Sequence, residues 1–237
     1  MSIRIGDSCA KSLAMVTPES RVVETRRFLV YPTQWFEIAR KCIAEKKFLI
    51  VTVCVGRDKG IEYYPTDIQW QNVIEDTIIK VMSVGGNINN WRLDIINEPM
   101  KFVSVIQYTN LINIAYQQAK GRVLIGAGCE EFVTAQARGN MYDYICRYAS
   151  FNVLVIHMQG SCSNEAETIR WTNYALDLAT RYRLKLDCNE ANLSDIGTSS
   201  GYSKLQMLLK HAERIGCENF AIVFNNLDQS AFAQNTD

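Results

Sequence analysis

The chain has 237 residues, 48% of them hydrophobic, and its 25 basic side chains balance 25 acidic ones. This length and composition predict one globular domain, residues 1–237, with a sizeable core. A net charge of zero argues against nucleic acid or an anionic membrane surface as an obligatory partner, because both attract basic surfaces.

The pattern of structural elements starts weakly at the N-terminus. We predict a strand at Ile3–Ile5, a short helix at Ser8–Met15 and a second strand at Arg27–Tyr31. A helix over Thr33–Lys46 follows, with Thr33 as its N-cap. The later predicted strands are Phe48–Val55, Trp91–Ile96, Arg122–Gly126, Asn152–His157, Leu184–Cys188 and Phe220–Phe224. The later predicted helices are Thr66–Val84, Val103–Ala119, Val133–Tyr148, Glu165–Tyr182 and Ser203–Ile215, the last ending at Gly216.

Eight apolar strands that alternate with helices over about 250 residues are typical of a (β/α)8 barrel. A doubly wound open sheet is the competing fold, but it normally carries a glycine-rich turn after its first strand. The chain contains neither GxGxxG nor GxxxxGK[ST]. We therefore predict the α/β class and a compact TIM barrel with short loops, in which the residues after the last strand are too few for a full eighth helix.

The eight cysteines are scattered and form no CxxC pair, which favours free thiols over a disulfide framework. The N-terminal segment lacks the apolar stretch of a signal peptide, and no run reaches the roughly 18 apolar residues of a transmembrane helix. We therefore expect a cytoplasmic protein. No feature of the sequence predicts its oligomeric state.

Polar residues gather where the predicted strands end, which is where TIM barrels carry their catalytic groups. Asn97-Glu98-Pro99 ends the fourth predicted strand, and Asn189-Glu190 ends the seventh. Two carboxylates that face one cavity can work as an acid and a nucleophile. The other strand ends supply Arg57, Glu130, Glu131, His157, Gln159, Asn225 and Asn226.

Asn-Glu-Pro after strand four, combined with a glutamate after strand seven, resembles the clan A glycoside hydrolases, the cellulase-like (β/α)8 superfamily. The resemblance covers roughly Trp91 to Asn226, over half the chain. It implies that Glu98 is the general acid/base and Glu190 the nucleophile. It also implies that Asn97 binds the 2-hydroxyl of the sugar.

The chemistry of glycoside hydrolysis fits this pair of glutamates independently. The reaction needs one protonated and one ionised carboxyl, about 5 Å apart for retention and further apart for inversion. Ionised Glu190 would help to keep a proton on Glu98, because two like charges disfavour each other. We expect retaining cleavage of a β-linked carbohydrate substrate, without a cofactor or a metal. The remaining predicted substrate-binding residues are His157, Gln159, Asn189 and Asn225.

The chain departs from the family pattern in several places. Glu190 is followed by alanine, where the family usually has a glycine close by. Strand six reads His-Met-Gln without the family's tyrosine, and Phe-Asn-Asn replaces the tryptophan that often ends strand eight. The arginine that the family places near strand two is either Arg26 or Arg27.

These departures leave two alternatives open. One is a catalytically degenerate barrel that binds carbohydrate or a protein surface. The other is a metal-dependent, sugar-converting barrel, in which carboxylates and His157 hold a divalent ion. Its other candidate ligands are Glu98, either Glu130 or Glu131, and Glu190. The sequence also favours core packing over sugar stacking for Trp35, Trp70, Trp91 and Trp171, and an inert thiol for Cys188.

Overall fold

The architecture comes from a computed structural model, which describes residues 3–29, 33–55, 64–99, 103–128, 131–137, 139–192 and 198–223. Eight parallel strands pair in chain order, and β8 pairs with β1 to close a barrel. The predicted (β/α)8 fold is confirmed. The strands are β1 (Arg4–Ala10), β2 (Val22–Phe28), β3 (Phe48–Cys54), β4 (Trp91–Ile95), β5 (Leu124–Gly128), β6 (Val153–Met158), β7 (Lys185–Asn192) and β8 (Asn219–Val223).

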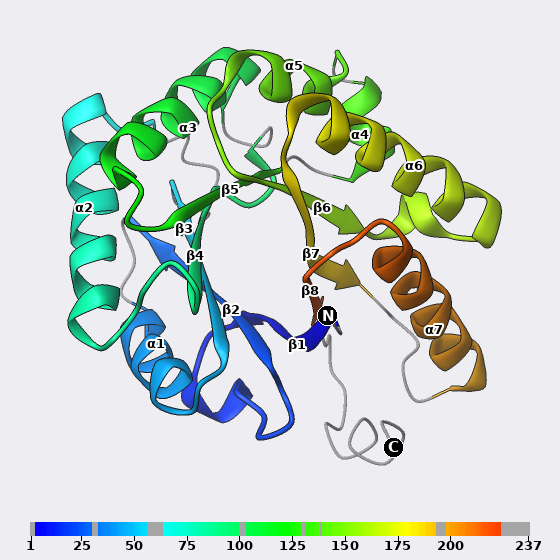
Figure 1. The fold of residues 1–237 in the computed structure, drawn as a ribbon, viewed down its shortest axis with the longest axis horizontal. Coiled ribbons are helices and arrows are strands. Elements are labelled where there is room, and N and C mark those ends of the chain that lie inside the picture. The colour runs from blue at the N-terminus through cyan, green and yellow to red at the C-terminus, as the bar shows by residue number, and fades with distance from the viewer. Residues whose placement is uncertain are drawn as a thin grey trace.

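The helices lie around the outside of the ring of strands (Figure 1). Thr66 caps α2 with its hydroxyl, and the Gln69 side chain accepts a hydrogen bond from the Thr66 backbone in return, which completes a capping box. Gly216, with φ of +80°, follows the end of α7 as predicted. The helices are α1 (Trp35–Ala44), α2 (Asp67–Ser83), α3 (Val105–Ala119), α4 (Phe132–Ala137), α5 (Met141–Tyr148), α6 (Glu165–Tyr182) and α7 (Ser199–Arg214), with 3-10 turns η1 (Leu13–Met15) and η3 (Gly160–Cys162).

The two N-terminal strands differ from the prediction. β1 runs on to Ala10, so the predicted helix at Ser8–Met15 is wrong and only its last three residues form a turn. β2 begins five residues before the strand predicted at Arg27–Tyr31 and overlaps it at Arg27 and Phe28. Its register is set by pairing with β3, where Val22 lies opposite Phe48. Local propensity could not reveal this long-range pairing.

Two helix predictions also need correction. The helix predicted over Val133–Tyr148 is two helices, because Gly139 (φ +91°) and Asn140 (φ +57°) between them adopt left-handed conformations that interrupt α-helical geometry. Thr33 does not cap α1. Its hydroxyl donates to the carbonyl of Arg26, and Gln34 is the N-cap.

The outer layer of the barrel is apolar, as the strand patterns predict. Along β4, Trp91, Leu93 and Ile95 belong to the main hydrophobic core. The tryptophans predicted as core residues are indeed buried, with exposed fractions of 8% or less. They are therefore unavailable as sugar platforms. These residues are Trp35, Trp70, Trp91 and Trp171.

The centre of the barrel is ionic. Arg92 in β4, 1% exposed, donates to both oxygens of Asp94 (2.5 and 2.9 Å) and also to Asp187 in β7. Because β5 and β6 separate β4 from β7 in the sheet, this last contact crosses the interior of the barrel. Asn219 in β8 donates to Asp187 from its backbone (2.7 Å) and its side chain (2.5 Å).

Burial and charge act in opposite directions on this cluster. Burial disfavours the charged form of Arg92, but the Asp94 and Asp187 carboxylates outweigh it and hold its pKa above the usual value. Burial raises the pKa of Asp94, against the effect of Arg92. Gly126 in β5 leaves the room that the cluster needs, because a Cβ there would lie 2.0 Å from an Asp94 oxygen.

Replacing Arg92 by methionine should destabilise the protein by about 3–5 kcal/mol, because two buried carboxylates would lose their counter-ion. Urea unfolding measures the change. Arg40→Met, on the exposed side of α1, is the matched control. A loss for Arg92→Met no larger than that for Arg40→Met would contradict a structural role for the buried ion pairs.

Glu75 in α2 should contribute to acid sensitivity. Two hydrogen bonds from Arg122 (2.8 and 2.5 Å) lower the pKa of Glu75 from 4.5 to about 2. A carboxyl whose pKa is lower in the folded state stabilises the fold above pH 4.5, and this contribution is lost as the pH falls towards 2. Both side chains are partly exposed, so the contribution stays below about 1 kcal/mol. Glu75→Gln should flatten the pH dependence of stability in that window, and Glu37→Gln, an exposed control, should leave it unchanged.

Candidate active site

Glu190 lies near the C-terminal end of β7, and its side chain is the centre of the candidate site. Arg26 in β2 donates from Nη2 to its Oε2 at 2.9 Å, and Gln159, just after β6, donates from Nε2 to its Oε1 at 2.9 Å. Only 11% of the Glu190 side chain is exposed. Residues from three strand ends therefore meet at one carboxylate.

A bulge in β7 explains how Glu190 reaches the barrel mouth. Ile156 of β6 pairs with Cys188, but the next residue, His157, pairs with Glu190, so Asn189 is an extra residue in β7. Strict alternation after Asp187 would turn Asn189 inward and Glu190 outward. The bulge lets both side chains face the interior, and re-aiming a side chain is a common role of bulges near functional sites.

The end of β4 meets the same carboxylate. With its amide oriented to satisfy both neighbours, Asn97 donates to Oε2 of Glu190 (3.2 Å) and accepts from Nη2 of Arg26 (3.3 Å). Ile96 and Glu98, on either side of Asn97, have φ of +52° and +48°. Positive φ is rare for non-glycine residues and most unusual for a β-branched one such as Ile96. The chain is thus bent where Asn97 and the half-buried Glu98 leave the strand.

The structure settles which arginine belongs to the mouth. Arg26 turns into the barrel towards Glu190, whereas Arg27 turns outward. Arg27 pairs with Asp76 of α2 (2.6 Å) and stacks over the ring of Trp35 (4.9 Å). Alternation along β2 separates the two neighbours, and only the true bounds of β2 reveal which one faces inward.

A second buried acid lies beside Arg26. Glu24, two residues earlier in β2 and 1% exposed, has Oε1 3.4 Å from Nε of Arg26. Burial works against the charged form of Arg26, but Glu24 and Glu190 together outweigh it and raise its pKa. A predicted strand that began at Val22 would have placed Glu24 and Arg26 on one face, but the predicted strand began at Arg27.

The other predicted site residues differ in their surroundings. His157 pairs with Glu190 across the β6–β7 ladder, is 2% exposed, and its Nδ1 finds no hydrogen-bond partner among the described residues. Asn189 points to the ionic centre of the barrel and donates to Asp94 at 3.2 Å. Asn225 lies outside the described residues, as do Arg57, Glu130 and Asn226. The sugar-binding roles of His157, Gln159 and Asn189 remain predictions.

Within the described residues, no three His, Cys, Asp or Glu side chains are grouped so that they could hold a metal ion. Glu190 instead contacts an arginine and two amides. No helix in the described part of the chain is both long and apolar enough to cross a membrane.

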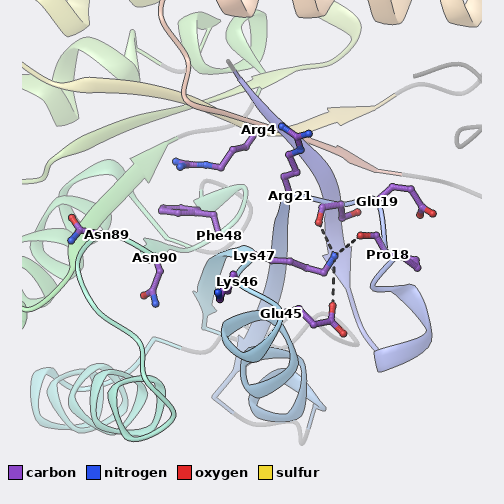
Figure 2. A pocket seen from close by; sticks show the side chains of 11 residues that line it. Arg4, Pro18, Glu19, Arg21, Glu45, Lys46, Lys47, Phe48, Asn89 and Asn90 are labelled. Atoms are coloured by element: carbon purple, nitrogen blue, oxygen red, sulfur yellow. Dashed lines mark hydrogen bonds and ion pairs between the residues drawn. The ribbon is translucent and has the colours of Figure 1, made fainter. Parts of the chain in front are cut away.

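Two open cavities lie at the end of the barrel opposite Glu190, where the strands begin. One, of about 420 Å³, opens where β1 to β4 begin, and Figure 2 shows its side chains. Its central cation, Lys47, donates to the carbonyls of Thr17, Pro18 and Ser20 at 2.7–2.9 Å and pairs with Glu45 at 3.6 Å. Lys47, directly before β3, therefore links the β1–β2 connection to the start of β3. A second cavity, of about 310 Å³, lies where β7 and β8 begin.

Several solved structures with a similar fold are glycoside hydrolases. A β-mannanase from Bacteroides ovatus matches with a TM-score of 0.65 at 10% identity, over 97% of this chain and 83% of that one. A fungal β-1,4-galactanase gives 0.68 at 10% identity, over 94% and 89%. What this chain shares with these enzymes is the closed (β/α)8 fold.

An endoglucanase catalytic domain from Thermobifida fusca gives a TM-score of 0.61 at 9% identity, over 96% of this chain and 80% of that one. No protein-family model matches the sequence, and no curated protein matches it by sequence either. At these identities the likeness concerns the fold, so the chemistry has to be argued from the residues of this chain.

Cys9, at the end of β1 beside Glu24, should react slowly with electrophiles. Burial, and then the negative charge of Glu24, raise the pKa of its thiol well above the usual value, so little thiolate forms near neutral pH. At about pH 8, iodoacetamide should alkylate Cys9 at least about tenfold more slowly in the folded protein than in concentrated urea. Peptide mass mapping gives both rates. Equal rates would point to an accessible thiolate at the mouth.

Proposed function

We propose that the protein is a retaining glycoside hydrolase that cleaves a β-glycosidic bond. One observation carries the proposal. The Glu190 carboxylate is held at the barrel mouth by Arg26, Gln159 and Asn97, and Asn97 is the residue directly before Glu98. The ends of β4 and β7 therefore meet, as a two-carboxylate mechanism needs. The fold shared with known glycoside hydrolases supports the same substrate class.

In the first step of the proposed mechanism, a Glu190 oxygen attacks the anomeric carbon while Glu98 gives its proton to the departing glycosidic oxygen. The bond from the anomeric carbon to that oxygen breaks, and an ester between the sugar and Glu190 forms. In the second step Glu98 removes a proton from water, the water oxygen bonds to the anomeric carbon, and Glu190 leaves. Two such inversions retain the β configuration.

The polar neighbours of Glu190 have defined tasks in this scheme. Arg26 and Gln159 each bind a different oxygen of the carboxylate and thereby fix its plane. Hydrogen bonds to a carboxylate are strong and geometrically specific, so these donors define the direction from which Glu190 can attack. Asn97 lies between Arg26 and Glu190 and can turn its amide to a sugar hydroxyl when a substrate enters. We further propose that residues 1–237 act as one domain in the cytoplasm.

A barrel that binds carbohydrate without cleaving it is the second candidate. It is favoured by the departure after strand six, where Met158 and Gln159 follow His157 and the tyrosine that the family has there is missing. Turnover of glycosides separates the two candidates, because a binding module has no turnover to lose.

Turnover on a panel of β-linked aryl glycosides and oligosaccharides tests the proposal. Glu98→Gln should lower kcat by about 10²–10⁴-fold, the usual share of general acid–base catalysis, and Glu190→Gln by at least as much. Glu213→Gln, on the exposed side of α7, is the matched control. Circular dichroism should show that all variants are folded.

A 2-deoxy-2-fluoro glycoside with an activated leaving group should add the mass of one fluoroglycosyl residue to the peptide that contains Glu190. The fluorine slows both steps, but the good leaving group keeps formation of the ester faster than its hydrolysis. Unchanged turnover in Glu190→Gln would refute the assigned nucleophile. An α-configured first product, detected by NMR, would refute retention.

A further inference from the structure

Glu24 is a buried acid that the proposed mechanism does not use. Its Oε2 accepts two hydrogen bonds from the end of β1, one from the backbone N–H of Cys9 at 2.5 Å and one from the hydroxyl of Ser8 at 3.2 Å. Burying a carboxylate is costly unless its charge is compensated. The anchored oxygen therefore has to be matched by a cation on the other side.

That cation is Arg26. The other oxygen of Glu24, Oε1, lies 3.4 Å from Nε of Arg26 without forming a hydrogen bond, so the contact is electrostatic. At its far edge the same guanidinium donates to Glu190 at 2.9 Å. Arg26 thus lies between two carboxylates, one anchored to β1 and one at the bulge of β7. The described residues show no hydrogen bond or ion pair between Glu24 and Glu190, and Arg26 is the side chain that contacts both.

We propose that Glu24 is a positioning residue that holds the Arg26 guanidinium in place. Held in this way, Arg26 orients Glu190 but neutralises only part of the negative charge of the Glu190 carboxylate. This inference rests on the proposed function, since it assigns Glu190 as the nucleophile. Glu24 touches neither substrate nor reacting atoms.

Charge sharing gives the inference its physical consequence. The single positive charge of Arg26 is shared between two carboxylates and therefore neutralises each of them only in part. The Glu190 oxygens keep electron density for the attack. Without the charge of Glu24, the guanidinium would pair with Glu190 alone and move towards it. A nucleophile that is bound more tightly to a cation and displaced by a fraction of an ångström attacks more slowly, while sugar contacts elsewhere stay as they are.

A double-mutant cycle tests the link. Glu24→Gln keeps the shape of the side chain and removes its charge, and it should lower kcat about 10–100-fold, with KM changed by no more than about twofold. Arg26→Met should lower kcat further. In the Arg26→Met background, adding Glu24→Gln should change kcat by less than about twofold, because the residue through which Glu24 acts is gone.

The control is Glu213→Gln, which removes an exposed carboxylate from α7 and should leave kcat and KM unchanged. Ser8→Ala covers the case in which Glu24→Gln does not fold. It removes only one of the two donors to Glu24 and should lower kcat by a few-fold. Two results would overturn the proposal. One is that Glu24→Gln lowers kcat by the same factor with and without Arg26, and the other is that KM rises while kcat is unchanged.

The urea midpoint of the same four proteins separates this inference from the proposed function. Glu24→Gln and Arg26→Met should each lower the urea midpoint. The double variant should lose clearly less than the two single losses added together. Additive losses would overturn the link between Glu24 and Arg26, whatever the activity. If the losses are non-additive but the wild-type protein hydrolyses no glycoside, the lack of hydrolysis refutes the glycosidase assignment, and the non-additivity leaves the Glu24–Arg26 link standing.

Discussion

The interaction on which the rest of the barrel depends is the pairing of Arg92 with Asp94 and Asp187. Barrel interiors are usually filled with layers of branched apolar side chains. Here a fully buried guanidinium ties β4 to β7 across the axis, and Asn219 extends the contacts to β8. Buried ion pairs are weak sources of stability but costly to break. A strand shifted by one residue would turn one of these side chains out of the interior and leave its partner buried without a counter-charge.

The polar interior continues upward into the candidate site. Asn189 donates to Asp94 below it, and the next residue, Glu190, contacts Arg26 at the mouth. The bulge in β7 makes both contacts possible at once. Left-handed residues at the end of β4 turn Asn97 towards the same carboxylate. Irregular backbone of this kind is unfavourable by itself and persists where surrounding contacts determine it. The contacts of Glu190 are such determinants.

The fold was largely predictable because its signals are local. Strands β3, β6 and β8 are short, mostly apolar runs, and helix α6 was predicted at its observed bounds, Glu165–Tyr182. The errors fell where local preference competes with distant partners. β2 was placed too late because its pairing with β3 decides its bounds, and β1 was cut short although Ser8 and Cys9 are held by Glu24. Similar barrels at about 10% identity show how little of the sequence the fold requires.

The sequence by itself determined the closed barrel and the two strand ends that carry Glu98 and Glu190, because strand count and the position of a residue after a strand are both local properties. Only the tertiary structure decided that Arg26 rather than Arg27 faces inward, that Asn189 belongs to the interior, and that Glu24 stands behind Arg26. These facts depend on register, on a one-residue bulge and on contacts between strands distant in the chain. A single-residue shift turns a side chain to the opposite face of the sheet, and no local pattern records such a shift.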